Sequence, residues 1–179
     1  MINPEIIVAL DVPNKKLMEQ TLDRMPNSIK WYKIGLELFC SEGPEILTSL
    51  KNREKSIFLD LKLHDIPRTV SNAVKTASEH GVDLMTVHAI GGRTMLEEAA
   101  LAAKSCSAPP KIVAVTTLTS LNERDFNDLG LFRSVEEQAV ALGELAIQSG
   151  IDGLVTSAHE AKTLRSAFPD SILVTPGIR

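Results

Sequence analysis

The stretch Phe58–Pro67 reads FLDLKLHDIP, and its alternation predicts a β-strand. Because successive side chains of a strand point to opposite faces, the leucines at positions 59, 61 and 63 share one face and suit packing against helices. The other face carries Phe58, Asp60, Lys62 and His64. Pro67 cannot continue the pairing and suits the first turn of a following helix.

The carboxylate of Asp60 and the ammonium of Lys62 are unusual on a strand of this kind. A charged pair is costly to bury unless something compensates, whereas barrel interiors are normally filled by aliphatic side chains. A structural ion pair, or an edge strand with a charged outer face, is the simplest alternative. A third ionisable group, Asp65, follows at once, and this clustering favours a functional site.

The rest of the chain alternates between strand-like and helix-like segments. Further strands are expected at 6–10, 31–39, 84–88, 111–116, 152–156 and 172–175. Helices are expected at 15–25, 44–50, 68–79, 94–104, 134–148 and 159–168, with a polar connection at 117–127. Repeated alternation of this kind indicates parallel strands joined by helical crossovers.

Two α/β architectures fit the alternation, and the polar residues distinguish them. At or just past the predicted strand ends lie Asp11, Lys33, Lys62, His88, Thr119 and Arg179. Contributions from many strands converge on one rim in a barrel, whereas a doubly wound sheet concentrates them beside a glycine-rich turn. We therefore predict a single α/β domain over residues 1–179, a (β/α)₈ TIM barrel with seven of its eight strands present. The eighth strand is expected beyond Arg179, so the barrel reads as truncated at the C-terminus.

Composition places the chain among ordinary globular proteins. Of its 179 residues, 44% are hydrophobic and 23% are charged, and the net charge of −4 makes a general nucleic-acid surface unfavourable. Cys40 and Cys106 have no zinc spacing and suit a reducing compartment. The first residues contain no signal-peptide pattern, and no stretch is apolar enough for a membrane span. A cytoplasmic protein without membrane contact is expected.

On the predicted rim, Lys33, Asp60 and Lys62, joined by Asp65 if it is supplied from nearby, form an alternating array of charges. An ammonium flanked by carboxylates is favoured in its charged form and can deliver a proton to a developing carbanion. A carboxylate beside it would repel a second carboxylate on a substrate, and loss of carbon dioxide would relieve that repulsion. The array predicts decarboxylation with no metal and no organic cofactor.

The same residues resemble the signature of the orotidine 5'-phosphate decarboxylase family. The matching segments are 8–11 (VALD), 32–35 (YKIG), 60–69 (DLKLHDIPRT), 87–89 (VHA), 118–120 (LTS) and 175–179 (TPGIR). Arg68 stands where that family usually has asparagine. The resemblance covers essentially the whole chain and implies conversion of orotidine 5'-phosphate to uridine 5'-phosphate and carbon dioxide in pyrimidine synthesis.

The resemblance also implies roles for single residues. Lys62 would be the proton donor, beside Asp60 at the scissile carboxylate. The other implied contacts are Asp11 and Lys33 with the ribose hydroxyls, Thr119 with the pyrimidine, Pro176 and Arg179 in the segment that closes over the phosphate, and Asp65 and Thr69 with the nucleotide of a dimer partner. A homodimer with shared active sites is therefore expected.

Three other functions remain open from the residues. Related sugar-phosphate decarboxylases and synthases share Asp-x-Lys-x-x-Asp but bind magnesium through an acid on the second strand, where this chain has Lys33, and an ammonium cannot ligate magnesium. A non-catalytic barrel would not need the intact array. A Schiff-base aldolase needs an uncharged lysine, which Asp60 disfavours. His64 and His88 lack ligand spacing and are expected to be hydrogen-bonded structural residues.

Overall fold

A computed structural model describes residues 4–118 and 120–177, and it contains a sheet of seven parallel strands. The strands are β1 (Ile7–Ala9), β2 (Trp31–Gly35), β3 (Ser56–Leu63), β4 (Leu84–His88), β5 (Lys111–Val115), β6 (Gly153–Val155) and β7 (Ile172–Val174). The helices are α1 (Lys15–Arg24), α2 (Leu36–Glu42), α3 (Glu45–Asn52), α4 (Pro67–Glu79), η1 (Ala89–Gly91), α5 (Arg93–Ser105), α6 (Glu123–Asp128), α7 (Val135–Gln148) and α8 (Ala161–Ala167).

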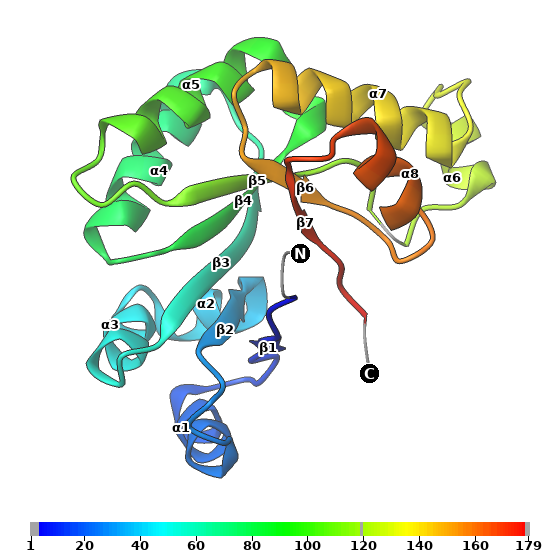
Figure 1. Cartoon of the computed structure of the whole chain (residues 1–179). Coiled ribbons are helices and arrows are strands. Elements are labelled where there is room, and N and C mark those ends of the chain that lie inside the picture. Colours follow the sequence, from blue (N-terminus) through cyan, green and yellow to red (C-terminus); the bar gives the residue numbers. More distant parts are fainter. Residues whose placement is uncertain (1–3, 119, 178–179) are drawn as a thin grey trace.

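The strands lie in the sheet in the order in which they occur along the chain, from β1 to β7, and every neighbouring pair is parallel. The sheet curls into a half-barrel with its crossover helices on the outside (Figure 1). The expected α/β class and parallel pairing are confirmed. Parallel strands all end at the same edge of the sheet, so side chains at their carboxyl ends are brought together.

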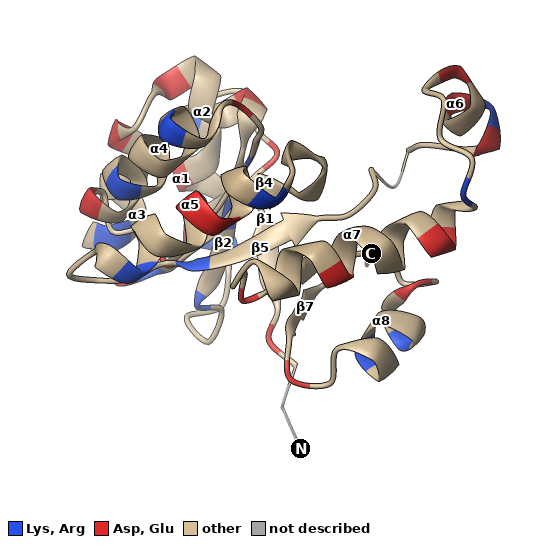
Figure 2. Ribbon diagram, turned by 90° about the horizontal axis from the view of Figure 1, so that it is seen from above, with Lys and Arg blue, Asp and Glu red and all other residues tan. Residues whose placement is uncertain are grey.

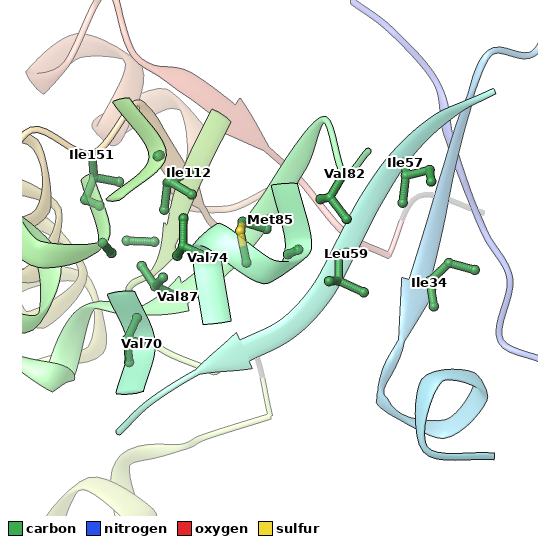
Figure 3. Close-up of a cluster of buried hydrophobic side chains, with 14 of the residues drawn as sticks. Ile34, Ile57, Leu59, Val70, Val74, Val82, Met85, Val87, Ile112 and Ile151 are labelled. Carbon is green, nitrogen blue, oxygen red and sulfur yellow. The ribbon is translucent and has the colours of Figure 1, made fainter. Parts of the chain in front are cut away.

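Two apolar clusters cover the two faces of the sheet. The larger cluster packs the sheet against the helices and includes Ile34, Ile57, Leu59, Val74, Met85 and Ile112 (Figure 3). The smaller cluster fills the inner face with Phe58, Leu84, Val113, Val115 and Val155. On β4 the alternation therefore places Leu84 inside and Met85 outside, so Thr86 and His88 follow Leu84 on the inner face.

The predicted strand at 31–39 is wrong in its second half. β2 ends at Gly35, and α2 begins at once with Leu36. The segment Leu36–Glu42 consists mainly of good helix formers, with Glu37 in the first turn where a carboxylate favours the helix dipole. An apolar run of mixed periodicity fits either a strand or a helix, and here the local propensity favours the helix.

A short helix, α6, begins inside the predicted polar connection at 117–127 and ends one residue past it, at Asp128. Asn122 caps it by accepting hydrogen bonds from Arg124 N and Asp125 N, and the Asp125 carboxylate accepts one from Asn122 N. This reciprocal pattern is a capping box, which satisfies backbone donors that the first turn leaves unpaired.

The strict alternation of the 58–67 stretch breaks inside β3. Leu59 pairs with Met85 but Leu63 pairs with Val87, so three residues of β3 lie opposite Thr86 alone. The bulge explains why only Leu59 is fully buried, whereas Leu61 and Leu63 are half-buried. The expectation of one uniform leucine face therefore holds only up to the bulge.

Acidic and basic residues are interspersed along the helices that cover the sheet (Figure 2). Within residues 4–118 and 120–177, no helix is both long enough and apolar enough to cross a membrane.

Candidate active site at the carboxyl ends of the strands

Four charged side chains from three neighbouring strands form a continuous row. Asp11 follows β1, Lys33 lies on β2, and Asp60 and Lys62 lie on β3. The Lys33 ammonium is 2.9 Å from an Asp11 carboxylate oxygen and 3.8 Å from an Asp60 oxygen. The Lys62 ammonium is 2.9 Å from each oxygen of Asp60. The signs therefore alternate along the row, which we call the charge array (Asp11, Lys33, Asp60 and Lys62).

Solvent exposure falls steeply toward the middle of the charge array. The side chain of Asp11 is 67% exposed, that of Lys33 20% and that of Asp60 14%, and Lys62 rises again to 34%. A carboxylate withdrawn this far from water needs compensation. Asp60 receives it from two ammonium groups and from the hydroxyl of Thr86, which donates a hydrogen bond of 3.1 Å.

The backbone of Lys62 is held in a conformation that residues with a side chain rarely adopt. Its φ angle is 51°, in the left-handed region. The bulge removes its amide from the regular ladder, and the Lys62 N–H donates instead to the Thr86 hydroxyl at 2.8 Å. Local strain of this kind persists only where the surrounding structure enforces it, and it clusters at functional sites.

Gly35 leaves space for the ammonium of Lys33. A Cβ at this position would lie 3.1 Å from Lys33 Nζ and 3.7 Å from an Asp11 carboxylate oxygen. Any larger residue would push against the Lys33–Asp11 pair. Gly35 therefore positions the charge array through the absence of a side chain.

Two histidines lie beside the array. The rings of His64 and His88 have their centroids 5.6 Å apart. Burial lowers the pKa of His88 below its ordinary value, and the neighbouring His64 and Lys62 lower it further. The expectation that His88 is a hydrogen-bonded structural residue is not met at one atom, because its Nδ1 is buried without a hydrogen-bond partner among the described residues.

Among the described residues, Asp65, Thr69 and Pro176 make no hydrogen bond or ion pair with the charge array. Asp65 is exposed, and its carboxylate accepts a hydrogen bond from Ile66 N at 2.6 Å. Thr69 is exposed on α4, and Pro176 is exposed after β7. Thr119 and Arg179 lie outside the described residues. Within the described ranges, no group of three or more His, Cys, Asp or Glu side chains could hold a metal ion.

Besides Gly35, Thr86 is a site residue that the sequence pattern did not predict. It is fully buried, yet it contacts both Asp60 and the Lys62 backbone. A signal was available, since Thr86 is the one hydroxyl in the strand LMTVH and shares its inner face with His88. Its contacts were not predictable, because they depend on the bulge in β3.

The family model described as "Orotidine 5'-phosphate decarboxylase / HUMPS family" matches residues 4–179. The chain belongs to this family. It is similar to curated orotidine 5'-phosphate decarboxylases from Gloeothece citriformis, at 46% identity, and from a Nostoc species, at 45%. Each alignment covers 100% of this chain and 78% of the relative.

Solved structures agree with this family assignment. The crystal structure of orotidine 5'-phosphate decarboxylase from Lactobacillus acidophilus superposes with a TM-score of 0.91 at 36% identity, covering 99% of this chain and 82% of that one. The crystal structure of an uncharacterized conserved protein from Geobacillus kaustophilus gives a TM-score of 0.89 at 41% identity, covering 95% and 82%. The half-barrel thus has the fold of the orotidine 5'-phosphate decarboxylase / HUMPS family, which confirms the expected barrel class.

Proposed function

We propose that the charge array carries out decarboxylation with Lys62 as the proton donor. The reaction of the chain is the conversion of orotidine 5'-phosphate to uridine 5'-phosphate and carbon dioxide in pyrimidine biosynthesis, which is the activity of relatives that match it over its full length. The observation that carries the proposed mechanism is the position of the Lys62 ammonium, 2.9 Å from both oxygens of Asp60.

The mechanism follows from these two side chains. The substrate carboxylate binds beside Asp60, whose carboxylate is held in position by contacts with Lys33, Lys62 and Thr86. The bond between C6 of the pyrimidine and the carboxylate carbon breaks, carbon dioxide leaves, and the electron pair stays on C6. Lys62 stabilises that carbanion by its charge and transfers a proton to it, forming the C6–H bond. The neutral amine then regains a proton from solvent.

Substrate binding is assigned to the Asp11 end of the charge array and to residues later in the chain. Asp11 and Lys33, paired at 2.9 Å, present an acceptor and a donor suited to ribose hydroxyls. Thr119 is assigned to the pyrimidine, and Pro176 and Arg179 to the segment that binds the phosphate. Contacts to the phosphate, far from the reacting carbon, would supply binding energy that is used at C6.

We further propose a homodimer whose active sites draw on both chains. Asp65, Ile66 and Thr69 are exposed and lie on one stretch directly after β3, so they are free to meet a neighbouring copy. In this arrangement Asp65 joins the charge array of the partner, and Thr69 contacts its nucleotide. The cytoplasm, where a small anionic nucleotide substrate is made and used, is the proposed location.

Subunit mixing tests the sharing of sites. Lys62→Ala and Asp65→Ala chains are each expected to be inactive, and their heterodimer should regain one complete site. A mixture of Lys62→Ala with Asp60→Ala is the matched control, because both residues lie on β3 of one chain and no complete site can form. Absence of recovery in the first mixture, with subunit exchange verified by mass, would refute shared sites.

A substrate comparison tests the reaction itself against the magnesium-dependent alternative. The protein should consume orotidine 5'-phosphate at the same rate with a strong chelator as with added Mg²⁺. It should leave 3-keto-L-gulonate 6-phosphate, a substrate of the related magnesium-dependent decarboxylases, unchanged under both conditions. Lys33, bound to Asp11 and close to Asp60, occupies the place where that alternative needs an acidic ligand. Turnover of the sugar phosphate that depends on Mg²⁺ would overturn the proposal.

A further inference from the structure

The bulge in β3 gives two catalytic groups a shared anchor on β4. Three residues of β3, Asp60, Leu61 and Lys62, lie opposite the single residue Thr86. A regular ladder would pair the Lys62 amide with a backbone carbonyl of β4, and the bulge removes that partner. The Thr86 side chain lies at this gap and takes the place of the missing backbone acceptor.

The Thr86 hydroxyl makes one contact to each catalytic residue. It accepts the Lys62 N–H at 2.8 Å and donates its own proton to Asp60 Oδ1 at 3.1 Å. A hydroxyl has one donor and two acceptor sites, so both bonds form at once without conflict. Thr86 is 0% exposed, and water therefore cannot substitute for either bond.

We propose that Thr86 is a positioning residue for the decarboxylation. Its hydroxyl holds Lys62 in the left-handed backbone conformation at φ 51°. The same hydroxyl oxygen, Thr86 Oγ1, also fixes the rotation of the Asp60 carboxylate. The distance between the Lys62 ammonium and Asp60 is therefore set from β4, which carries neither group. This inference rests on the proposed function, since it assigns Thr86 a role at the same site.

The side chain of Thr86 makes the inference directly testable. Thr86→Val keeps the branched shape and removes the hydroxyl, whereas Thr86→Ser keeps the hydroxyl and removes the methyl group. A misplacement of reacting groups by about 1 Å lowers the reaction rate about 100-fold, so Thr86→Val should lower kcat by about 10- to 100-fold. Its affinity for uridine 5'-phosphate should change less than about threefold, because ribose and phosphate contacts lie elsewhere. Thr86→Ser should retain most of the wild-type kcat.

Thr116, just after β5, provides the matched control. It is also buried, and among the described residues its hydroxyl donates to the Val155 carbonyl at 3.4 Å and to no member of the charge array. Thr116→Val should keep the wild-type kcat. Should Thr86→Val not fold, Thr86→Ser and Thr86→Ala make the same comparison in smaller side chains, with alanine lacking the hydroxyl.

The outcomes separate this inference from the proposed function. The positioning role is supported if the wild-type protein turns over orotidine 5'-phosphate while Thr86→Val shows a low kcat and an unchanged affinity for uridine 5'-phosphate. A wild-type kcat in a folded Thr86→Val, or an equal loss in Thr86→Ser, would overturn it and leave the decarboxylase function intact. Failure of the wild-type protein to consume orotidine 5'-phosphate would instead refute the proposed function.

Discussion

Replacing Lys62 by glycine and by alanine separates the role of its ammonium from the cost of its backbone conformation. Both variants lose the ammonium, so both leave Asp60 with Lys33 and Thr86 as partners. They differ in one respect, because alanine keeps a Cβ at φ 51° and glycine does not. Both should be inactive, and the glycine variant should be the more stable of the two.

The size of this difference follows from the backbone angle. A residue with a Cβ in the left-handed region costs about 1–2 kcal/mol. Glycine avoids this cost, but its greater conformational freedom in the unfolded chain destabilises the folded state by roughly 0.5–1 kcal/mol. The free energy of unfolding of Lys62→Gly should therefore exceed that of Lys62→Ala by about 1 kcal/mol, equivalent to about 2–4 °C in Tm for a chain of this size.

Urea unfolding of both variants, with controls at two other positions, measures the difference. At Glu54, whose φ is 56°, the glycine variant should likewise have a higher free energy of unfolding than the alanine variant. Lys75 lies exposed within α4, and there glycine should be about 1 kcal/mol less stable than alanine. A Lys62→Gly protein that is no more stable than Lys62→Ala, with both controls as expected, would refute the claim that the fold holds Lys62 under strain.

Three further predictions concern single residues. Gly35→Ala should lower kcat/KM by about 3- to 10-fold, because its Cβ would lie 3.1 Å from the Lys33 ammonium and force that group to shift; steady-state kinetics equal to wild type would contradict this. The pKa of His88 is lowered in the folded protein, so as the pH falls the unfolded chain takes up a proton at this residue before the folded chain does. The stability that neutral His88 contributes above about pH 6.5 is therefore lost as the pH falls. Wild type should therefore lose more Tm between pH 7.5 and 5.5 than His88→Gln, and parallel pH profiles would exclude His88 as the cause. Gly153→Ala should destabilise the protein by about 2–3 kcal/mol, since its Cβ would lie 2.1 Å from the Ile172 carbonyl oxygen, and an unchanged urea midpoint would contradict that close packing.

Much of the fold was predictable because the strands are short, buried and separated by helices of regular period. The strand 84–88 was predicted with the bounds that the structure shows. The pairing of Asp60 with Lys62 follows from their spacing on a strand. The left-handed backbone of Lys62 does not, because it arises from the mismatch between three residues of β3 and one of β4.

The remaining parts of the site depend on contacts that a sequence pattern does not contain. Gly35 matters because Lys33 folds back over it, and Thr86 matters because the bulge leaves an amide without a ladder partner. Asp65 and Thr69 are exposed, so their predicted role depends on a second chain.

The most direct test of the central claim is the turnover of orotidine 5'-phosphate by wild-type protein and by Lys62→Ala, followed as loss of the orotate-type ultraviolet absorbance. Proton donation contributes about 10²–10⁴-fold and charge stabilisation a further 10²–10³-fold, so kcat should fall by at least about 10⁴-fold in the variant. Circular dichroism should show that Lys62→Ala retains the fold. Near-normal turnover by a folded Lys62→Ala protein would contradict the assignment of Lys62 as the proton donor.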